Sequence, residues 1–538
     1  MRFSGGAGPA TGLATARSRR SALAVVLAVL FLTFLDTTIV SVALGDLEND
    51  ISAGVIPLQW IVNAYALVFA SLMLIGGSLA DRWGRKWVML AGIVVFCIGS
   101  VMCAVAGGVA MVIAGRAVMG LGAAASEPGT LSVIRQLFPD HRERARALGA
   151  WSAVSGLALA AGPVIGGLLV GADGWRMIFW FNLALGLVLL VAVWALVPDS
   201  RDPQPGRIDL AGFAVGTGGI FSLVFAAISG EYKGYGTWWV ITLFVVGAAG
   251  LIAFVPIENR VSSPMLPPAY LKAPIVRTAL FAAAAVYFAV FAIFFLTALY
   301  LDIEPRLDYT GWQQAGMFAP MATAIVVGGL VAGPWVARQG SKVPMVVGCA
   351  LAAAGILFAR IELGNGPSLT FGLLSAALGL AGLGFGITVV PLTSAVLSHV
   401  PARHSGIAAS ATNTARQLGA VIGVVALGAI VNAHLTAEVD RTFGDPMLAG
   451  ARKNIMQVLE TGGTAGGFNP HTIPPNFLDA FLDGVKVSLI VAIGLMVLAG
   501  VASAVVREPR NAEDGQPTVT GSTPSGSAPP ITSSTGAA

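Results

Sequence analysis

Long apolar stretches recur along almost the whole chain, and they constrain its fold more than any other feature. A membrane-spanning helix needs about 20 mostly apolar residues, and fourteen stretches meet that need. They lie near residues 21–44, 58–79, 87–106, 109–136, 145–170, 175–197, 209–229, 237–257, 276–302, 312–337, 343–361, 367–398, 405–432 and 486–507. Only 11% of the residues are charged, against about 25% in a soluble protein. The sequence therefore predicts an all-α polytopic membrane protein with fourteen transmembrane helices.

The basic residues predict which helix ends face the cytoplasm. If the N-terminus is inside, 21 of the 31 Lys and Arg residues fall in inner segments and 8 in outer segments, with Arg116 and Arg416 inside spans. Cytoplasmic loops of membrane proteins carry such an excess of Lys and Arg. We therefore expect a multi-pass protein of the cell membrane with both termini cytoplasmic. The net charge of +4 follows from these loops and implies no nucleic-acid partner.

An internal repeat divides the chain. The loop GSLADRWGRK at 77–86 recurs as GPWVARQGSK at 333–342, and FPDHRERA at 138–145 has a counterpart in VPARHSGI at 400–407. In the second copy of the first loop, Ala337 replaces Asp81. A duplication of this kind is typical of transporters, which bind substrate between two helix bundles near the middle of the membrane.

The repeat predicts five parts. They are a basic cytoplasmic tail (1–20), an N-terminal six-helix bundle (21–200), a linker with two extra transmembrane helices (201–274), a C-terminal six-helix bundle (275–508) with a long outer loop (433–485), and a disordered cytoplasmic tail (509–538). The last tail is rich in Pro, Ser, Thr and Gly and cannot bury a core.

Four motifs resemble those of one transporter family. GGSLADRWGRKWVML resembles the loop motif of the major facilitator superfamily. LDTTIVSVAL at 35–44, GLALAAGPVIGG at 156–167 and WRMIFWFN at 175–182 resemble motifs in the first, fifth and sixth helices of its fourteen-span drug:proton antiporters. The resemblance covers nearly all of residues 21–508. It implies a multidrug efflux protein, associated with antibiotic resistance, that exports amphipathic and often cationic drugs in exchange for protons.

Three charged residues inside spans are candidates for proton and substrate coupling. Ionisable side chains in a membrane are costly and usually face a cavity or a partner. Asp36 lies well inside the first span, and Arg116 and Glu127 lie eleven residues apart on the fourth. Eleven residues make about three helical turns, so both side chains share a face. A carboxyl group there can bind a proton or attract a cationic drug. A structural hydrogen bond for Asp36 and a structural role for Arg116 are the alternatives.

Further candidates come from the motifs. The resemblance implies that the inner loop latches the transporter in its outward-facing state, through Gly77, Asp81, Arg82, Gly84, Arg85 and Lys86. The alternative is a positively charged anchor at the inner surface. The antiporter motif contributes Gly162, Pro163, Gly166 and Gly167, which make one span thin and bendable or simply allow close packing. Asn63, Tyr65 and Arg416 are possible cavity residues.

The chain lacks the sequence motifs that several other functions require. The chain has no HExxH, CxxC, GxSxG or GxxxxGK[ST] pattern, so we expect no enzyme activity, no metal site and no cofactor. The expected partners are a small-molecule substrate, protons and membrane lipid, with a monomeric transport unit. A dedicated exporter of an endogenous lipid, siderophore or metabolite is the main alternative, followed by a polytopic membrane enzyme and by a channel.

Overall fold

A computed structural model describes residues 16–51, 55–200, 209–261, 270, 272–303, 311–363, 367–401, 404–442 and 475–506. Within these ranges the ordered elements are all helices, and no strand occurs. The predicted tail 509–538 lies outside the described residues. The all-α fold class is confirmed.

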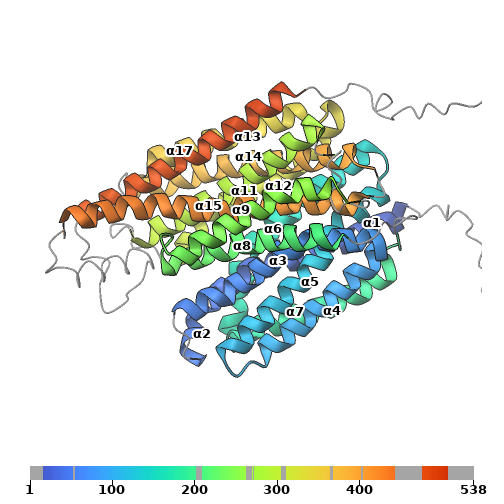
Figure 1. Ribbon diagram of the computed structural model, residues 1–538, viewed down its shortest axis with the longest axis horizontal. Helices are drawn as coiled ribbons and strands as arrows, with labels where there is room; N and C mark the ends of the chain where they lie inside the picture. Colours follow the sequence, from blue (N-terminus) through green and yellow to red (C-terminus); the bar gives the residue numbers. More distant parts are fainter. Residues whose placement is uncertain are drawn as a thin grey trace, which may run out of the picture. The chain divides into compact units, whose positions relative to one another are not determined.

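The helices follow one another along the chain as long segments, most of which run along the long direction of the view in Figure 1. They are α1 (Ala16–Ile39), η1 (Val40–Ala43), α2 (Leu44–Ile51), α3 (Val55–Trp83), α4 (Arg85–Ala104), α5 (Val109–Leu137), α6 (His141–Asp173), α7 (Arg176–Leu196), α8 (Leu210–Lys233), α9 (Trp238–Glu258), α11 (Pro274–Ile303), α12 (Gly311–Gln339), α13 (Lys342–Glu362), α14 (Pro367–His399), α15 (Ser405–Thr442) and α17 (Pro475–Val505).

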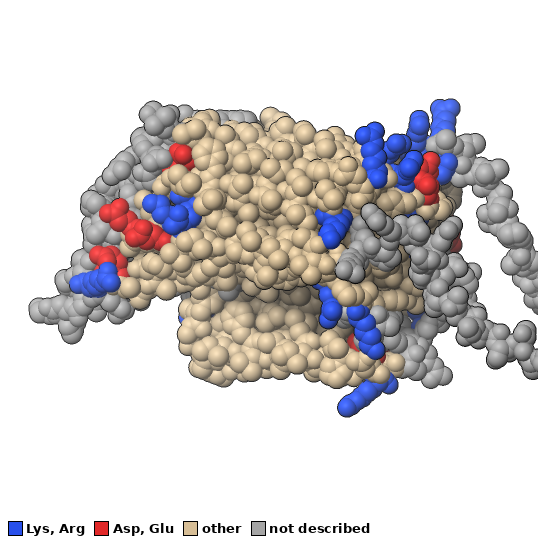
Figure 2. Space-filling model, turned by 90° about the horizontal axis from the view of Figure 1, so that it is seen from above, with Lys and Arg blue, Asp and Glu red and all other residues tan. Residues whose placement is uncertain are grey.

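Most of these helices match the predicted spans. Among the described residues, thirteen helices are long and apolar enough to cross a membrane, and the bent helix α6 brings the number to fourteen. Large apolar side chains on their outer surface are widely exposed, as at Trp238 (76%) and Ile252 (75%). Figure 2 shows broad areas without charged side chains, and Lys and Arg concentrated toward one side of the view. Such a surface is suited to lipid, and the chain is a multi-pass membrane protein.

The bend in α6 lies at the antiporter motif. The two segments of the helix, 141–159 and 164–173, meet at 41°, and Pro163 between them has no N–H to donate to the preceding turn. A Cβ atom added at Gly162 would lie 2.0 Å from Thr38 Oγ1, and this hydroxyl donates to the Leu159 carbonyl at 3.0 Å. By contrast, an added Cβ at Gly167 would meet no described atom within 4 Å. Close packing against α1 therefore occurs at Gly162 and not at Gly167.

The helix bounds differ from the predicted bounds of the spans in two places. The first span was expected to reach residue 44, but α1 ends at Ile39 and continues as the tighter helix η1 and the short helix α2. The outer loop was expected at 433–485, but α15 runs to Thr442 and α17 begins at Pro475. These helix ends mix polar residues with good helix formers such as Ala, Leu and Glu, and a search for long apolar stretches does not detect them. Residues 443–474 of the loop lie outside the described residues.

Helix contacts define two sets, which we call the first set (α1 and α3–α7) and the second set (α11–α15 and α17). In the first set, α5 packs against α3 and α4, and α1 packs against α6 and α7. In the second set, α14 packs against α12 and α13, and α15 packs against α11 and α17. The sets meet where α6 contacts α12 and where α15 contacts α3 and α5. Helices α8 and α9 pack against each other, and α8 also contacts α3 and α15.

Candidate functional site

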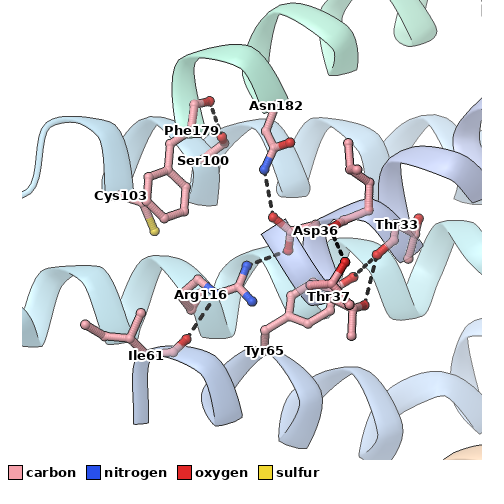
Figure 3. A network of polar contacts seen from close by, with 12 residues as sticks. Thr33, Asp36, Thr37, Ile61, Tyr65, Ser100, Cys103, Arg116, Phe179 and Asn182 are labelled. Atoms are coloured by element: carbon pink, nitrogen blue, oxygen red, sulfur yellow. Dashed lines mark hydrogen bonds and ion pairs between the residues drawn. The ribbon is translucent and has the colours of Figure 1, made fainter. Parts of the chain in front are cut away.

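A buried ion pair joins α1 to α5. Asp36 and Arg116 have no exposed surface, and Arg116 Nη1 lies 2.5 Å from Asp36 Oδ2. Asn182 of α7 donates from Nδ2 to the other carboxylate oxygen at 2.7 Å, and Arg116 Nε donates to the Ile61 carbonyl of α3 at 3.0 Å. Figure 3 shows these side chains reaching Asp36 and Arg116 from separate helices. Four helices of the first set are therefore tied together around one compensated charge pair.

Tyr65 belongs to this network. Its ring lies 4.5 Å from the Arg116 guanidinium carbon, and its hydroxyl donates to the Thr33 carbonyl at 3.0 Å. The side chain is 1% exposed. Tyr65 therefore supports the ion pair and does not line the cavity described below, and neither does Asn63, which is only half-buried on the same helix.

A second polar network connects the two helix sets. Asn413 of α15 donates from Nδ2 to Glu127 Oε2 of α5 at 2.5 Å. The Asn413 side-chain oxygen accepts a hydrogen bond from Arg416 Nη1 at 2.7 Å, and Arg416 Nη2 donates to Thr393 Oγ1 of α14 at 2.5 Å. Glu127 and Arg416 are 0% and 2% exposed. The Asn413 amide thus lies between a buried carboxyl group and a buried guanidinium group.

Aromatic rings surround the cationic end of this network. The Arg416 guanidinium carbon lies 4.8 Å from the Trp151 ring of α6 and 5.5 Å from the Tyr287 ring of α11. Cation–π contacts at these distances are favourable. The Trp151 indole N–H donates to Thr130 Oγ1 at 3.1 Å, which fixes its ring against α5.

A small cavity lies beside Glu127 and Arg416. Its lining comes from both helix sets and consists of Phe34, Thr37, Phe69, Met73, Glu127, Leu159, Tyr287, Phe291, Asn413, Arg416 and Gln417. An apolar wall with a few polar groups is the usual composition of a small-molecule site. The cavity volume of ≈ 20 Å³ is enough for about one water molecule. A drug-sized ligand can therefore enter only if the helix sets move apart.

The inner loop connects the two sets at a different place. Asp81 at the end of α3 accepts hydrogen bonds from the backbone N–H groups of Gly406 and Ile407, both at 3.0 Å. These groups lie in the first turn of α15, whose N–H groups have no partner within the helix. Arg85 Nη2 lies 2.7 Å from the same carboxylate. Asp81 is 5% exposed, so a buried acid of one set caps a helix of the other.

The rest of the loop has local roles. Gly84 adopts φ +102°, a left-handed conformation that favours glycine, and it allows the turn from α3 into α4. An added Cβ at Gly77 would lie 1.9 Å from Ser410 Oγ, so a glycine there allows α3 to approach α15. Lys86 Nζ donates to the Trp194 carbonyl in the last turn of α7 at 2.6 Å. Arg82 is half-buried.

The predicted charges therefore separate into two networks. Arg116 and Glu127 lie on the same helix, as expected, but Arg116 contacts Asp36 and Glu127 contacts Asn413 of the other set. Sequence reasoning did not single out Asn182, Asn413, Thr393 and Trp151. An Asn inside an apolar span is a detectable signal, and Asn182 and Asn413 both carry it. Thr393 and Trp151 carry no such signal, because Thr and Trp are ordinary residues of membrane helices.

The fold and the cavity together define a class of protein. Two sets of membrane helices that meet around a cavity with buried charges are typical of secondary transporters. A sequence profile of the Major Facilitator Superfamily matches residues 26–424. The chain belongs to this superfamily.

The relatives of the chain are drug-resistance and export proteins. It is 31% identical to the multidrug resistance protein Stp of Mycobacterium tuberculosis over 485 residues, which cover 88% of this chain and 89% of Stp. It is 30% identical to the tetracenomycin C resistance and export protein of Streptomyces glaucescens over 519 residues, which cover 94% of each chain. A crystal structure of the human organic anion transporter MFSD10 is similar in fold, with a TM-score of 0.59 and 14% identity over 90% of this chain and 99% of that one.

Proposed function

We propose that this protein is a proton-coupled antiporter that exports drugs or related small molecules across the cytoplasmic membrane. The proposal rests on the position and the hydrogen bonding of Glu127. One of its oxygens accepts a hydrogen bond from Asn413, and the other has no partner among the described residues. It also lines the cavity where the two helix sets meet. An acid in that position can hold a proton or a substrate group.

Asp36 is a weaker candidate for the exchanged proton. Both of its carboxylate oxygens have donors, one from Arg116 and one from Asn182. A carboxylate whose two oxygens both accept hydrogen bonds from the protein has no oxygen left without a donor for a substrate group. We therefore assign the exchanged proton to Glu127, and we assign to Asp36 and Arg116 the joining of α1, α3, α5 and α7 into a unit that moves together.

The exchange follows from competition at one group. A proton that reaches Glu127 from the outer side displaces a substrate group from the carboxylate, and the substrate leaves. Loss of the proton to the inner side restores the carboxylate for the next substrate. A potential of about 100 mV contributes roughly 2.3 kcal/mol for each charge moved across the membrane, which is enough to drive such a cycle. The names of the relatives, which refer to antibiotic resistance and export, support this direction of transport.

Transport into proteoliposomes tests the proposal. Vesicles with an acidic interior present protons to the outer face of inverted molecules, so a panel of ethidium, puromycin and hydroxyanthraquinones should yield at least one compound that accumulates. Collapse of the gradient with nigericin should release that compound. Glu127→Gln keeps the size of the side chain but removes its titration, and it should abolish accumulation. Glu143→Gln is the matched control, because Glu143 forms an exposed ion pair with Arg19. Equal accumulation by the Glu127→Gln variant and the parent would overturn the proposal.

A further inference from the structure

We propose that the cavity binds hydroxylated aromatic molecules, with a hydrogen-bond acceptor of the ligand on Arg416 and a donor on Glu127. This inference rests on the proposed transport function and narrows its substrate class. It departs from the expectation of cationic drugs, because the structure places a buried cation in the cavity wall.

Arg416 is a buried guanidinium group that forms no direct ion pair among the described residues, because the Asn413 amide separates it from Glu127. It is 2% exposed, and it donates hydrogen bonds to the neutral oxygens of Asn413 and Thr393. Its Nε atom has no hydrogen-bond partner among the described residues. A buried donor of a charged group that lacks a hydrogen-bond partner is costly, and charge-assisted hydrogen bonds are the strongest that it can form. A ligand that brings an anion or a carbonyl oxygen would supply what the protein leaves out.

Glu127 presents the complementary group. Its Oε1 atom is buried and has no partner among the described residues, so it can accept a hydrogen bond from a ligand hydroxyl or amine. The Asn413 amide separates Glu127 from Arg416, so the acid and the cation do not neutralise each other by direct contact. The cavity wall therefore offers one acceptor and one donor to the same ligand.

The remaining wall selects for flat aromatic molecules. Phe34, Phe69, Tyr287 and Phe291 line the cavity, and Trp151 and Tyr287 pack against the Arg416 guanidinium group. Aromatic rings stack on such side chains in offset or edge-to-face arrangements. A permanent cation without donors would be attracted by Glu127 and repelled by Arg416, whereas a phenol with a quinone carbonyl satisfies both.

This substrate class agrees with proton exchange. A phenolic hydroxyl donates to Oε1 of the charged form of Glu127, and protonation of Oε1 turns that acceptor into a donor. Arg416 keeps its charge throughout, so it orients the ligand in every cycle while Glu127 decides between binding and release.

Equilibrium binding to the purified protein in lipid nanodiscs tests the inference without any proton gradient. The probes are 2,6-dihydroxyanthraquinone, its dimethyl ether, which lacks the donors, and tetraphenylphosphonium, which is a permanent cation. The parent protein should bind the dihydroxy probe about tenfold more tightly than the other two, since a hydrogen bond to a charged group contributes enough for such a factor. Tighter binding of tetraphenylphosphonium than of the dihydroxy probe would overturn the inference.

Variants identify the residue responsible. Arg416→Gln should weaken binding of the dihydroxy probe about tenfold and leave the affinity for tetraphenylphosphonium unchanged or higher. Arg19→Gln, at an exposed position, should change neither affinity. If Arg416→Gln does not fold, Thr393→Val removes only one anchor of the guanidinium group and should weaken the dihydroxy probe alone. Unchanged affinity in the folded variants would contradict the inference. No proton gradient is used in the binding experiment. A failure of proton coupling in the transport assay can therefore be told apart from a failure of the binding preference.

Discussion

At the scale of single residues, the buried carboxyl groups of Asp36 and Glu127 differ in how completely their oxygens are hydrogen-bonded. The Asp36 carboxylate has a cation and an amide donor, at 2.5 Å and 2.7 Å. Glu127 has one amide donor on one oxygen and none on the other. A carboxylate with donors on both oxygens is suited to holding helices together, and an acid with one oxygen left without a donor is suited to exchanging a ligand. The sequence predicted the buried charges but not their roles, because each role depends on a partner far away in the chain. Asn413 lies 286 residues from Glu127, and Arg116 lies 80 residues from Asp36.

Removal of one member of the ion pair should destabilise the protein. Asp36→Asn leaves Arg116 buried without a counter-ion, and such changes cost about 3–5 kcal/mol. Arg116→Gln should cost a similar amount, whereas the double variant should cost less than the sum of the two, because neither charge is then left alone. Thermal unfolding of the purified variants measures this. Additive effects of the two substitutions would show that the residues do not depend on each other.

At the scale of helices, the two copies of the repeat cap corresponding helices in different ways. Helix α6 has its own cap, because Asp140 accepts from the backbone N–H groups of Arg142 and Glu143 at 2.9 Å. In the second copy Ala402 occupies the place of Asp140, and the first turn of α15 is capped by Asp81 from α3 instead. This explains why the second loop can have Ala337 in place of the acid. The aligned motifs contain this exchange, but only the structure reveals which helix end each acid caps.

Asp81→Asn should slow transport and change substrate affinity by no more than a few-fold. The amide has one oxygen in place of two, so it cannot accept from both N–H groups of α15 and pair with Arg85 as the carboxylate does. The contact also lies outside the cavity. Transport rate and binding affinity are measured separately, with Asp199→Asn as the control because Asp199 is an exposed acid near the same loop. A collapse of affinity with normal turnover at saturation would contradict a role in the exchange between states.

The cap of α6 should show a defined pH dependence. The hydrogen bond from the Glu143 N–H is the main cause that lowers the pKa of Asp140 below its ordinary value of 3.8. A lowered pKa means that the charged cap stabilises the fold above that ordinary value and that this contribution is lost as the pH falls through the lowered pKa. Asp140→Asn keeps a capping oxygen without the charge. The parent should unfold at a higher temperature than the variant at pH 6, and the difference should disappear as the pH falls below 3.8.

At the scale of the whole molecule, contacts between the helix sets also occur where the repeated loops lie. Asp81 reaches α15 there, and Arg135 at the end of α5 donates to the Leu397 carbonyl at the end of α14. The number of spans was predictable because bilayer thickness fixes the length of an apolar helix. The contacts between the helix sets were not, because they join residues hundreds of positions apart.

The orientation of the chain can be measured directly. The excess of basic residues in the predicted inner segments predicts that both termini are cytoplasmic. A cysteine introduced at Gly463 should react with an impermeant reagent only from outside, and one at Gly515 only from inside. The native residues Cys97, Cys103 and Cys349 are buried, so they give little background. Labelling of each cysteine from the opposite side would show that the predicted orientation is wrong.

Proton release from the purified protein tests most directly whether Glu127 exchanges its proton for substrate. Substrate is added to weakly buffered protein in detergent, and a pH dye follows the medium between pH 6 and 8. The parent should release protons on binding, because the ligand donor requires the charged form of Glu127. Glu127→Gln should release none, while Glu143→Gln should behave as the parent. Proton release from the Glu127→Gln variant equal to that of the parent would place the coupling site elsewhere.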